Sequence, residues 1–245
     1  MVPGGSERQP IGRITRGIER GTLVLRTVGF VQGQLAAWRD DPSRPNEQSE
    51  DRLNLQLCKF LDARARSQFP MVCFHHEEYE AGHRSVDLSA SPVKAILIGA
   101  RPHTVYTPFL VLECKRLPTP SLDREREYVT GGVATSGGIQ RFKLGLHGAH
   151  LDCAAMIAYL QQYTPQWWHD RINRWILELC NGTATDGCNW TRGEGLEPLR
   201  EDPAEGVASY RSVHARSGRV LSQEIRIYHL WVVMNFRTAE TRGSS

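Results

Sequence analysis

The sequence predicts an α/β fold in which a central mixed sheet is flanked by helices. Two apolar runs, Phe109–Leu112 and Cys153–Leu160, are typical of buried strands in the middle of a sheet. Two other stretches, 46–69 and the segment that starts at Pro165, carry apolar residues at the three- and four-residue spacing of an amphipathic helix. A chain of 245 residues with 40% hydrophobic content is long enough to bury a sizeable core.

Composition excludes several classes of protein. The hydrophobic content of 40% and charged content of 23% are close to globular averages and argue against wholesale disorder. No apolar run approaches the ~18 residues that a membrane span needs, and the first ten residues lack the apolar segment of a signal peptide. The six cysteines form no C-x-x-C or zinc-type pairs, which favours buried thiols in a reducing compartment. We therefore expect a cytoplasmic protein with no membrane partner.

The first half of the chain alternates helical and extended patterns. Pro42, Pro45 and Pro70 mark the ends of elements, and Asn46 or Ser49 can cap the second helix. In chain order we expect a flexible arm at 1–20, helices at 22–40 and 46–69, and strands at 71–80, 84–90, 93–98 and 106–117, with a turn at 81–83.

The second half continues the alternation and ends in a hairpin. Its expected elements are helical pieces at 122–129 and 139–146 around a glycine-rich stretch, a strand at 153–160, a helix from Pro165, a loop at 181–206, and strands at 208–216 and 224–235 around the Ser217-Gly218 turn. The order α-β-β-β-α-β, followed by a helix and a strand hairpin, predicts one domain at 21–245, with its core at 46–161 and a C-terminal extension at 162–236.

Charged residues follow directly on the strongest strand pattern. Glu113 and Lys115 are two residues apart, so in a strand they project from the same face while Cys114 projects from the other. Asp87 lies in a neighbouring strand-like segment and can share a pocket with Glu113 if the two strands pair. Two carboxylates of this kind suit Mg²⁺, and their mutual repulsion predicts that one pKa is raised. The alternative is a strand-end ion pair from Glu113 to Lys115 or an arginine, with Asp87 in a turn.

Asp87 and Glu113-Cys114-Lys115, within Phe-Leu-Val-Leu-Glu-Cys-Lys-Arg, resemble the PD-(D/E)xK nuclease superfamily of restriction-endonuclease-like proteins. The resemblance spans roughly residues 46–161 and includes the order of the elements. It implies that Asp87 and Glu113 bind Mg²⁺, with Mn²⁺ as a possible substitute, and that Lys115 supports the attacking water. One departure is that Val86, rather than proline, precedes Asp87.

Two further site residues are implied by the same resemblance. The superfamily often adds a glutamate from the first core helix, and Glu50 matches it best because it shares a helix face with Leu53 and Leu57; Glu47 is the rival. Some branches place a glutamine in the helix after the E-x-K strand, and Gln140 can match it.

The expected function is a Mg²⁺-dependent endonuclease that hydrolyses DNA phosphodiester bonds, plausibly in restriction or phage defence. Arg84, Arg116 and Arg141 are expected to hold the phosphate backbone. A net charge of +3 is small for a nuclease, so we also expect a homo-oligomer or a partner subunit. The alternatives are a catalytically inactive DNA-binding or scaffold subunit with the same fold, or a nuclease that acts on RNA.

Three other patterns have both structural and functional interpretations. The His75-His76 pair suits an exposed edge strand better than a metal site, and the alternating polar residues 212, 214 and 216 suit either a substrate-contacting rim or a half-exposed strand. The tryptophans of the helix that starts at Pro165 (Trp167, Trp168 and Trp175) are expected to serve the core or an interface rather than base stacking.

Overall fold

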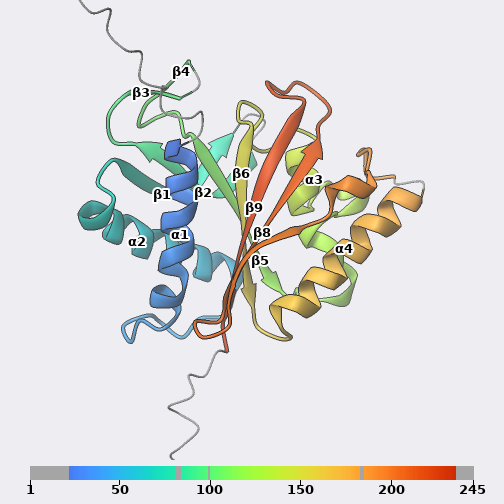
Figure 1. The fold of residues 1–245 in the computed structure, drawn as a ribbon, viewed down its shortest axis with the longest axis horizontal. Helices are drawn as coiled ribbons and strands as arrows, with labels where there is room; N and C mark the ends of the chain where they lie inside the picture. Colours follow the sequence, from blue (N-terminus) through green and yellow to red (C-terminus); the bar gives the residue numbers. More distant parts are fainter. Residues whose placement is uncertain (1–21, 81–83, 99, 183–184, 236–245) are drawn as a thin grey trace, which may run out of the picture.

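The computed structural model describes residues 22–80, 84–98, 100–182 and 185–235. The arm expected at 1–20 and the turn expected at 81–83 lie outside these residues. Within them the chain forms a seven-stranded mixed sheet in the order β1-β2-β5-β6-β9-β8-β7, with helices on both faces (Figure 1). The strands of this sheet are β1 (Val72–Glu80), β2 (Arg84–Pro92), β5 (Leu110–Leu117), β6 (Cys153–Leu160), β7 (Glu197–Asp202), β8 (Val207–Ala215) and β9 (Glu224–Val233).

The centre of the sheet is parallel and its margins are antiparallel. Strands β5, β6 and β9 run in the same direction. Strand β2 pairs antiparallel with β5 and β1 with β2, while β8 pairs antiparallel with β9 and β7 with β8. A separate two-stranded sheet consists of β3 (Ile96–Ile98) and β4 (Arg101–His103). The expected α/β fold with a mixed sheet and flanking helices is confirmed.

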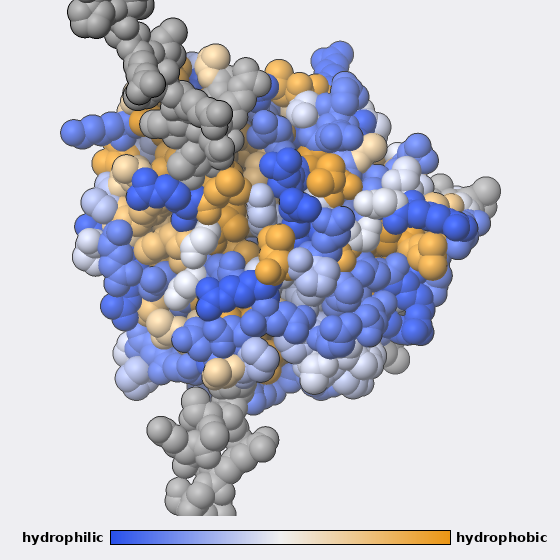
Figure 2. Space-filling view, in the orientation of Figure 1, coloured by the Kyte–Doolittle hydropathy of each residue, from blue (hydrophilic) through white to orange (hydrophobic). Residues whose placement is uncertain are grey.

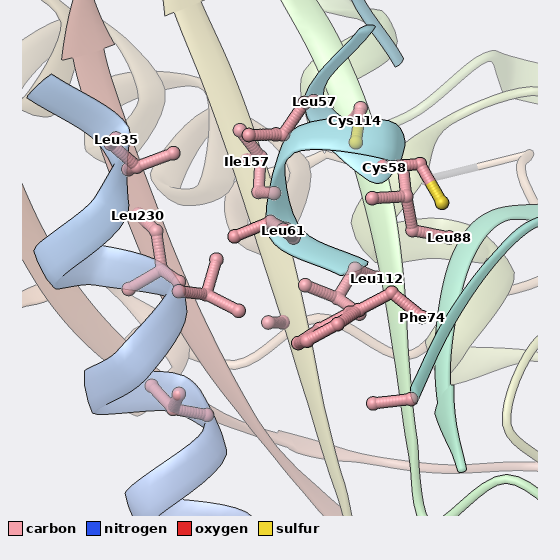
Figure 3. Close-up of a cluster of buried hydrophobic side chains, with 14 of the residues drawn as sticks. Leu35, Leu57, Cys58, Leu61, Phe74, Leu88, Leu112, Cys114, Ile157 and Leu230 are labelled. Atoms are coloured by element: carbon pink, nitrogen blue, oxygen red, sulfur yellow. The ribbon is translucent and has the colours of Figure 1, made fainter. Parts of the chain in front are cut away.

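Each face of the sheet has its own hydrophobic core. Helices α1 (Thr22–Arg39) and α2 (Glu50–Gln68) cover one face, and Figure 3 shows the packing of their leucines against those of the strands. The other face lies under the 3₁₀ helix η1 (Leu122–Tyr128), the short helix α3 (Gly138–Lys143) and the helix α4 (Pro165–Asn181). Two further 3₁₀ turns are η2 (Gly132–Ala134) and η3 (Arg192–Glu194).

Several expected boundaries are wrong. The loop expected at 181–206 contains strand β7, which is charged and mostly exposed because it is an edge strand. Helix α2 begins at Glu50 rather than at residue 46, with Ser49 as its extended N-cap residue. Strand β5 begins at Leu110 rather than at residue 106, because Thr104 and Thr107 close a turn just before it. The segment expected as a 3.6-residue helix at 122–129 is a 3₁₀ helix.

Polar side chains cover most of the face shown in Figure 2, and apolar residues gather over α1. Leu25 on that helix is 46% exposed. In the part of the chain that the structure describes, no helix combines the length and apolar character needed to cross a membrane.

A substitution at Leu112 tests the hydrophobic core between α1, α2 and the sheet. Its side chain is fully buried, so we expect Leu112→Ala to lower the free energy of unfolding by about 2–5 kcal/mol through lost burial and the cavity left behind. Urea unfolding measures the change. Leu97→Ala is the matched control, because Leu97 is 74% exposed and should change stability by less than about 0.5 kcal/mol. Equal effects of the two changes would contradict the assigned core.

Candidate active site

The Glu113 side chain lies at the middle of β5, on the sheet face covered by α3 and α4. Its strand neighbour Cys114 is buried in the opposite core, beneath α1 and α2. The side chains of Glu113 and Lys115 are 0% and 7% exposed. The shared face expected for these two residues is therefore confirmed by the alternation of the strand.

Asp87 lies where β2 and β5 separate. The last pair of that ladder joins Leu88 to Leu112, so Asp87 and Glu113 come next on their respective strands. Asp87 Oδ2 accepts a hydrogen bond of 2.7 Å from the backbone N–H of Cys114. The aspartate carboxylate thus replaces the carbonyl that would continue the ladder, and it lies in a strand rather than in a turn.

Glu113 is surrounded by cationic and imidazole nitrogens from three segments. Its Oε1 lies 3.0 Å from Lys115 Nζ and 2.7 Å from an Arg141 guanidinium nitrogen. Its Oε2 lies 3.1 Å from His147 Nδ1, but the two atoms are not aligned for a hydrogen bond, and among the described residues neither has another partner. The ion pairs that a purely structural role predicts for Glu113 are therefore present, together with one buried carboxylate oxygen that makes no aligned hydrogen bond within the described structure.

Glu50 joins the site from the first turn of α2. Its Oε1 lies 3.1 Å from Lys115 Nζ, and its Oε2 accepts a 2.7 Å hydrogen bond from the backbone N–H of Arg116. The rival Glu47 is exposed and lines a groove with Trp38 and other residues instead. The structure thus brings together four of the five residues expected at the site: Asp87, Glu113, Lys115 and Glu50.

Burial and neighbouring charge shift the pKa values of this group in different directions. Burial, together with repulsion by Glu113, raises the pKa of Asp87 to about 8. Burial alone would raise the pKa of Glu113, but Lys115, His147 and Arg141 together outweigh it, so this pKa lies below its usual range. Burial alone would lower the pKa of Lys115, but Glu113 and Glu50 raise it above its usual value. Near neutral pH, Glu113 and Lys115 are therefore ionised, whereas Asp87 holds a proton.

Gln140 does not reach this cluster with its amide. Its Oε1 accepts from the backbone N–H groups of Gly131 and Gly137, and its Nε2 donates to the carbonyls of Gly132 and Asp186. These four bonds use the hydrogen-bonding capacity of the side chain. Gln140 therefore joins the glycine-rich loop to the loop at Asp186, and its neighbour Arg141 is the α3 residue that contacts Glu113.

The three arginines expected to hold phosphate have different surroundings. Arg141 is bonded to Glu113, and Arg116 donates from its side chain to the carbonyl of Gln48 at 3.4 Å. The side chain of Arg84 lies outside the described part of the structure. His147 was not expected at the site, and only its place in a Gly-flanked loop before a buried strand could have drawn attention to it.

The polar residues 212, 214 and 216 form neither a rim nor a half-exposed face. Ser212, His214 and Arg216 are buried, and Ser212 Oγ lies 2.7 Å from Nε2 of both His214 and His229. Arg216 donates to the carbonyls of the loop that carries His147. The expectation of a substrate-contacting rim is wrong. The second half of β8 does alternate between buried and exposed positions, as a half-exposed strand does, but its polar residues take the buried positions under α3 and η3. By contrast, β1, which carries His75 and His76, is an edge strand as expected.

The donor set fits a Mg²⁺ ion better than a metal held by protein ligands alone. No cluster of three or more His, Cys, Asp or Glu side chains able to hold a metal occurs among the described residues. Mg²⁺ commonly uses only one or two carboxylates and completes its shell with water and substrate phosphate. Asp87 and Glu113 could supply those carboxylates, and among the described residues the Oε2 atom of Glu113 makes no aligned hydrogen bond, although His147 Nδ1 lies 3.1 Å from it.

Comparison of this chain with protein-family models, curated proteins and solved structures finds no match.

Asp87 should make stability depend on pH. Between the usual pKa of about 4 and the folded-state pKa of about 8, the folded protein binds a proton that the unfolded chain does not, so stability falls as pH rises through this window. We expect Asp87→Asn to remove this part of the slope and to be at least as stable as wild type at pH 8. Urea unfolding in EDTA at pH 5, 6.5 and 8 measures both effects.

Glu113→Gln is the contrasting variant. It leaves Lys115 and Arg141 without a buried anionic partner, so it should lose stability, by up to about 3–5 kcal/mol. If Asp87→Asn kept the wild-type pH slope, the proposed proton on Asp87 would be excluded.

Proposed function

We propose that this protein is a Mg²⁺-dependent endonuclease that hydrolyses DNA phosphodiester bonds, and that it belongs with the restriction-endonuclease-like nucleases. The observation that carries the proposal is that a fully buried Glu113 lies beside Asp87 at the point where β2 leaves β5. One carboxylate oxygen of Glu113 makes no aligned hydrogen bond among the described residues. A lysine two residues further along the same strand face completes the group.

Asp87 and Glu113 would hold the ion. Bound Mg²⁺ or Mn²⁺ supplies a water of lowered pKa and neutralises phosphate charge. Because the pKa of Lys115 is raised, this side chain stays protonated and does not act as a general base. Lys115 therefore donates hydrogen bonds that orient a water molecule and stabilise the negative charge that develops on the phosphate. Glu50 restricts the ammonium group by accepting from it at 3.1 Å.

The cysteines and the net charge of the chain bear on where and how such a nuclease would act. All six cysteines are free thiols, which supports a reducing, cytoplasmic place of action. The small net charge of +3 supports binding of DNA as a homo-oligomer or with a partner subunit, and it fits an effector that is not constantly active. Restriction or phage defence is the role that these features favour.

A second candidate is a DNA-binding or scaffold subunit without catalysis. The observation that favours it is the mutual neutralisation of Glu113, Lys115 and Arg141, since such a network can serve stability alone. Cleavage assays on DNA and on RNA of the same sequence separate this candidate, the proposed nuclease and an RNA-directed enzyme.

Lys115→Ala should reduce cleavage of plasmid DNA by about 100- to 1,000-fold, because it removes the charged donor next to the reacting phosphate. The assay compares Mg²⁺, Mn²⁺, Ca²⁺ and EDTA, and activity is expected with Mg²⁺ and Mn²⁺. Lys94→Ala is the matched control, since Lys94 is exposed. Circular dichroism and DNA binding in Ca²⁺ verify that the Lys115 variant is folded. Wild-type turnover in a folded Lys115→Ala protein would contradict the proposed role.

Metal binding can be tested without activity. A Mg²⁺ concentration of about 100 times its Kd should stabilise the wild-type protein by about 2.7 kcal/mol, which corresponds to a rise in Tm of about 5–10 °C. Asp87→Asn should lose most of this rise, because it removes one of the two carboxylates. Thermal melts with Mg²⁺ and with EDTA measure it, and an equal rise in Asp87→Asn would place the ion elsewhere.

A further inference from the structure

An exposed pair of stacked aromatic rings lies where β6 leads into α4. Tyr163 and Trp167 are 55% and 38% exposed, and their ring centroids are 4.1 Å apart with planes inclined by 14°. The other two tryptophans of this helix, Trp168 and Trp175, are buried as expected. Of the two roles expected for these tryptophans, the core holds for Trp168 and Trp175, whereas the exposed Trp167 is left with the interface.

The local structure holds this aromatic pair in place. Trp168 is fully buried, contacts both rings edge-on, and donates from Nε1 to the carbonyl of Gln162 at 2.8 Å. Thr164 Oγ1 accepts from the backbone N–H of Trp167 and caps the helix. Tyr163 has a φ of +63°, a left-handed conformation that is unfavourable for a bulky residue. The pair is thus presented to solvent at a local conformational cost.

The aromatic pair follows the carboxyl end of β6, which lies beside the carboxyl end of β5. The backbone N–H of Gln161 donates to the carbonyl of Leu117, two residues beyond Lys115 on β5. The side chain of Gln161 also donates to Gln48, which precedes Glu50 by two residues. These bonds join the loop that carries Tyr163 to both strand β5 and the start of α2.

The chemistry of the pair suits a nucleobase. A stacked tyrosine and tryptophan leave outer ring faces to which a further flat ring can add, and such stacking accepts any base. The Arg171 guanidinium lies 5.9 Å from the Trp167 ring and 5.3 Å from the Trp175 ring, so a cation borders the aromatic surface. Arg171 is also 3.3 Å from Glu125, which fixes its position.

We propose that Tyr163 and Trp167 stack an unpaired base of the DNA substrate close to the scissile phosphate. The preferred substrates are then DNA molecules with unpaired bases beside a duplex, such as overhangs, flaps or gaps. This inference rests on the proposed nuclease function and deepens it by naming the class of DNA.

The test measures binding in Ca²⁺, which provides the divalent charge that the site needs to attract DNA and in which no cleavage is expected. Fluorescence anisotropy compares a labelled duplex carrying a single-stranded overhang with a blunt duplex. Trp167→Ala should bind the overhang DNA about 5- to 100-fold more weakly, while its affinity for the blunt duplex changes little. Trp167→Phe should restore most of the loss. Leu177→Ala is the matched control, because Leu177 is on the same helix and 44% exposed.

Intrinsic fluorescence gives a second measurement. Each of the other five tryptophans is at most 5% exposed, so quenching on addition of overhang DNA should arise from Trp167 and disappear in Trp167→Phe. Unchanged overhang affinity in Trp167→Ala, or an equal loss for both DNAs, would overturn the stacking role. If wild type also cleaves DNA in that case, the nuclease proposal stands alone.

The opposite pattern is equally informative. Overhang binding that depends on Trp167, without cleavage in any divalent cation, would support the stacking surface and overturn the catalytic proposal. Absence of wild-type binding to either DNA would overturn both.

Discussion

A fully buried carboxylate at the centre of a sheet must be compensated, and much of the site architecture meets this requirement for Glu113. Burial of an unpaired charge is costly, so the acid needs cationic or hydrogen-bonding partners. They come from β5 itself, from α3 through Arg141 and from the loop before β6 through His147. Lys115 in turn is compensated by Glu50, which ties in the start of α2. Glu113 therefore connects β5 to α3 and the loop that follows it, and through Lys115 to the start of α2.

The same face contains a second buried network, and together the two explain why a helix as short as α3 is ordered. Isolated helices of six residues are unstable in water, but α3 contributes Arg141 to Glu113 and Lys143 to Glu194. Beyond Glu194 the hydrogen bonds of this network all donate toward Glu194, because each hydroxyl has a single proton to donate and each neutral imidazole has one donor and one acceptor nitrogen. Burial lowers the pKa of His214 and of His229, which favours their neutral forms. The continuing members are His214, Ser212, His229, Tyr128 and Trp231.

The features that the sequence predicts well are those fixed by local pattern. The apolar run of β6, the proline that starts α4 and the shared face of Glu113 and Lys115 depend only on neighbouring residues. The errors arise where distant partners decide the outcome. His214 is buried because Glu194 reaches it from another segment, and β7 exists because β8 supplies a pairing edge for an otherwise polar stretch. Gln140 fits a position of the superfamily pattern in the sequence, yet its amide hydrogen-bonds to two loops instead of reaching the site. No local pattern in the sequence predicts the path of those loops.

The charge balance of the site explains why a divalent cation belongs in the proposal. Glu50, Asp87 and Glu113 are three carboxyl groups, and Lys115 and Arg141, their cationic partners, are already engaged by Glu50 and Glu113. With a proton on Asp87, whose pKa is about 8, these groups sum to zero, and when that proton leaves they become net negative. A phosphodiester is itself an anion, so neither state attracts it. A divalent cation that displaces the proton from Asp87 makes the sum positive, and its binding should therefore strengthen as pH rises toward 8.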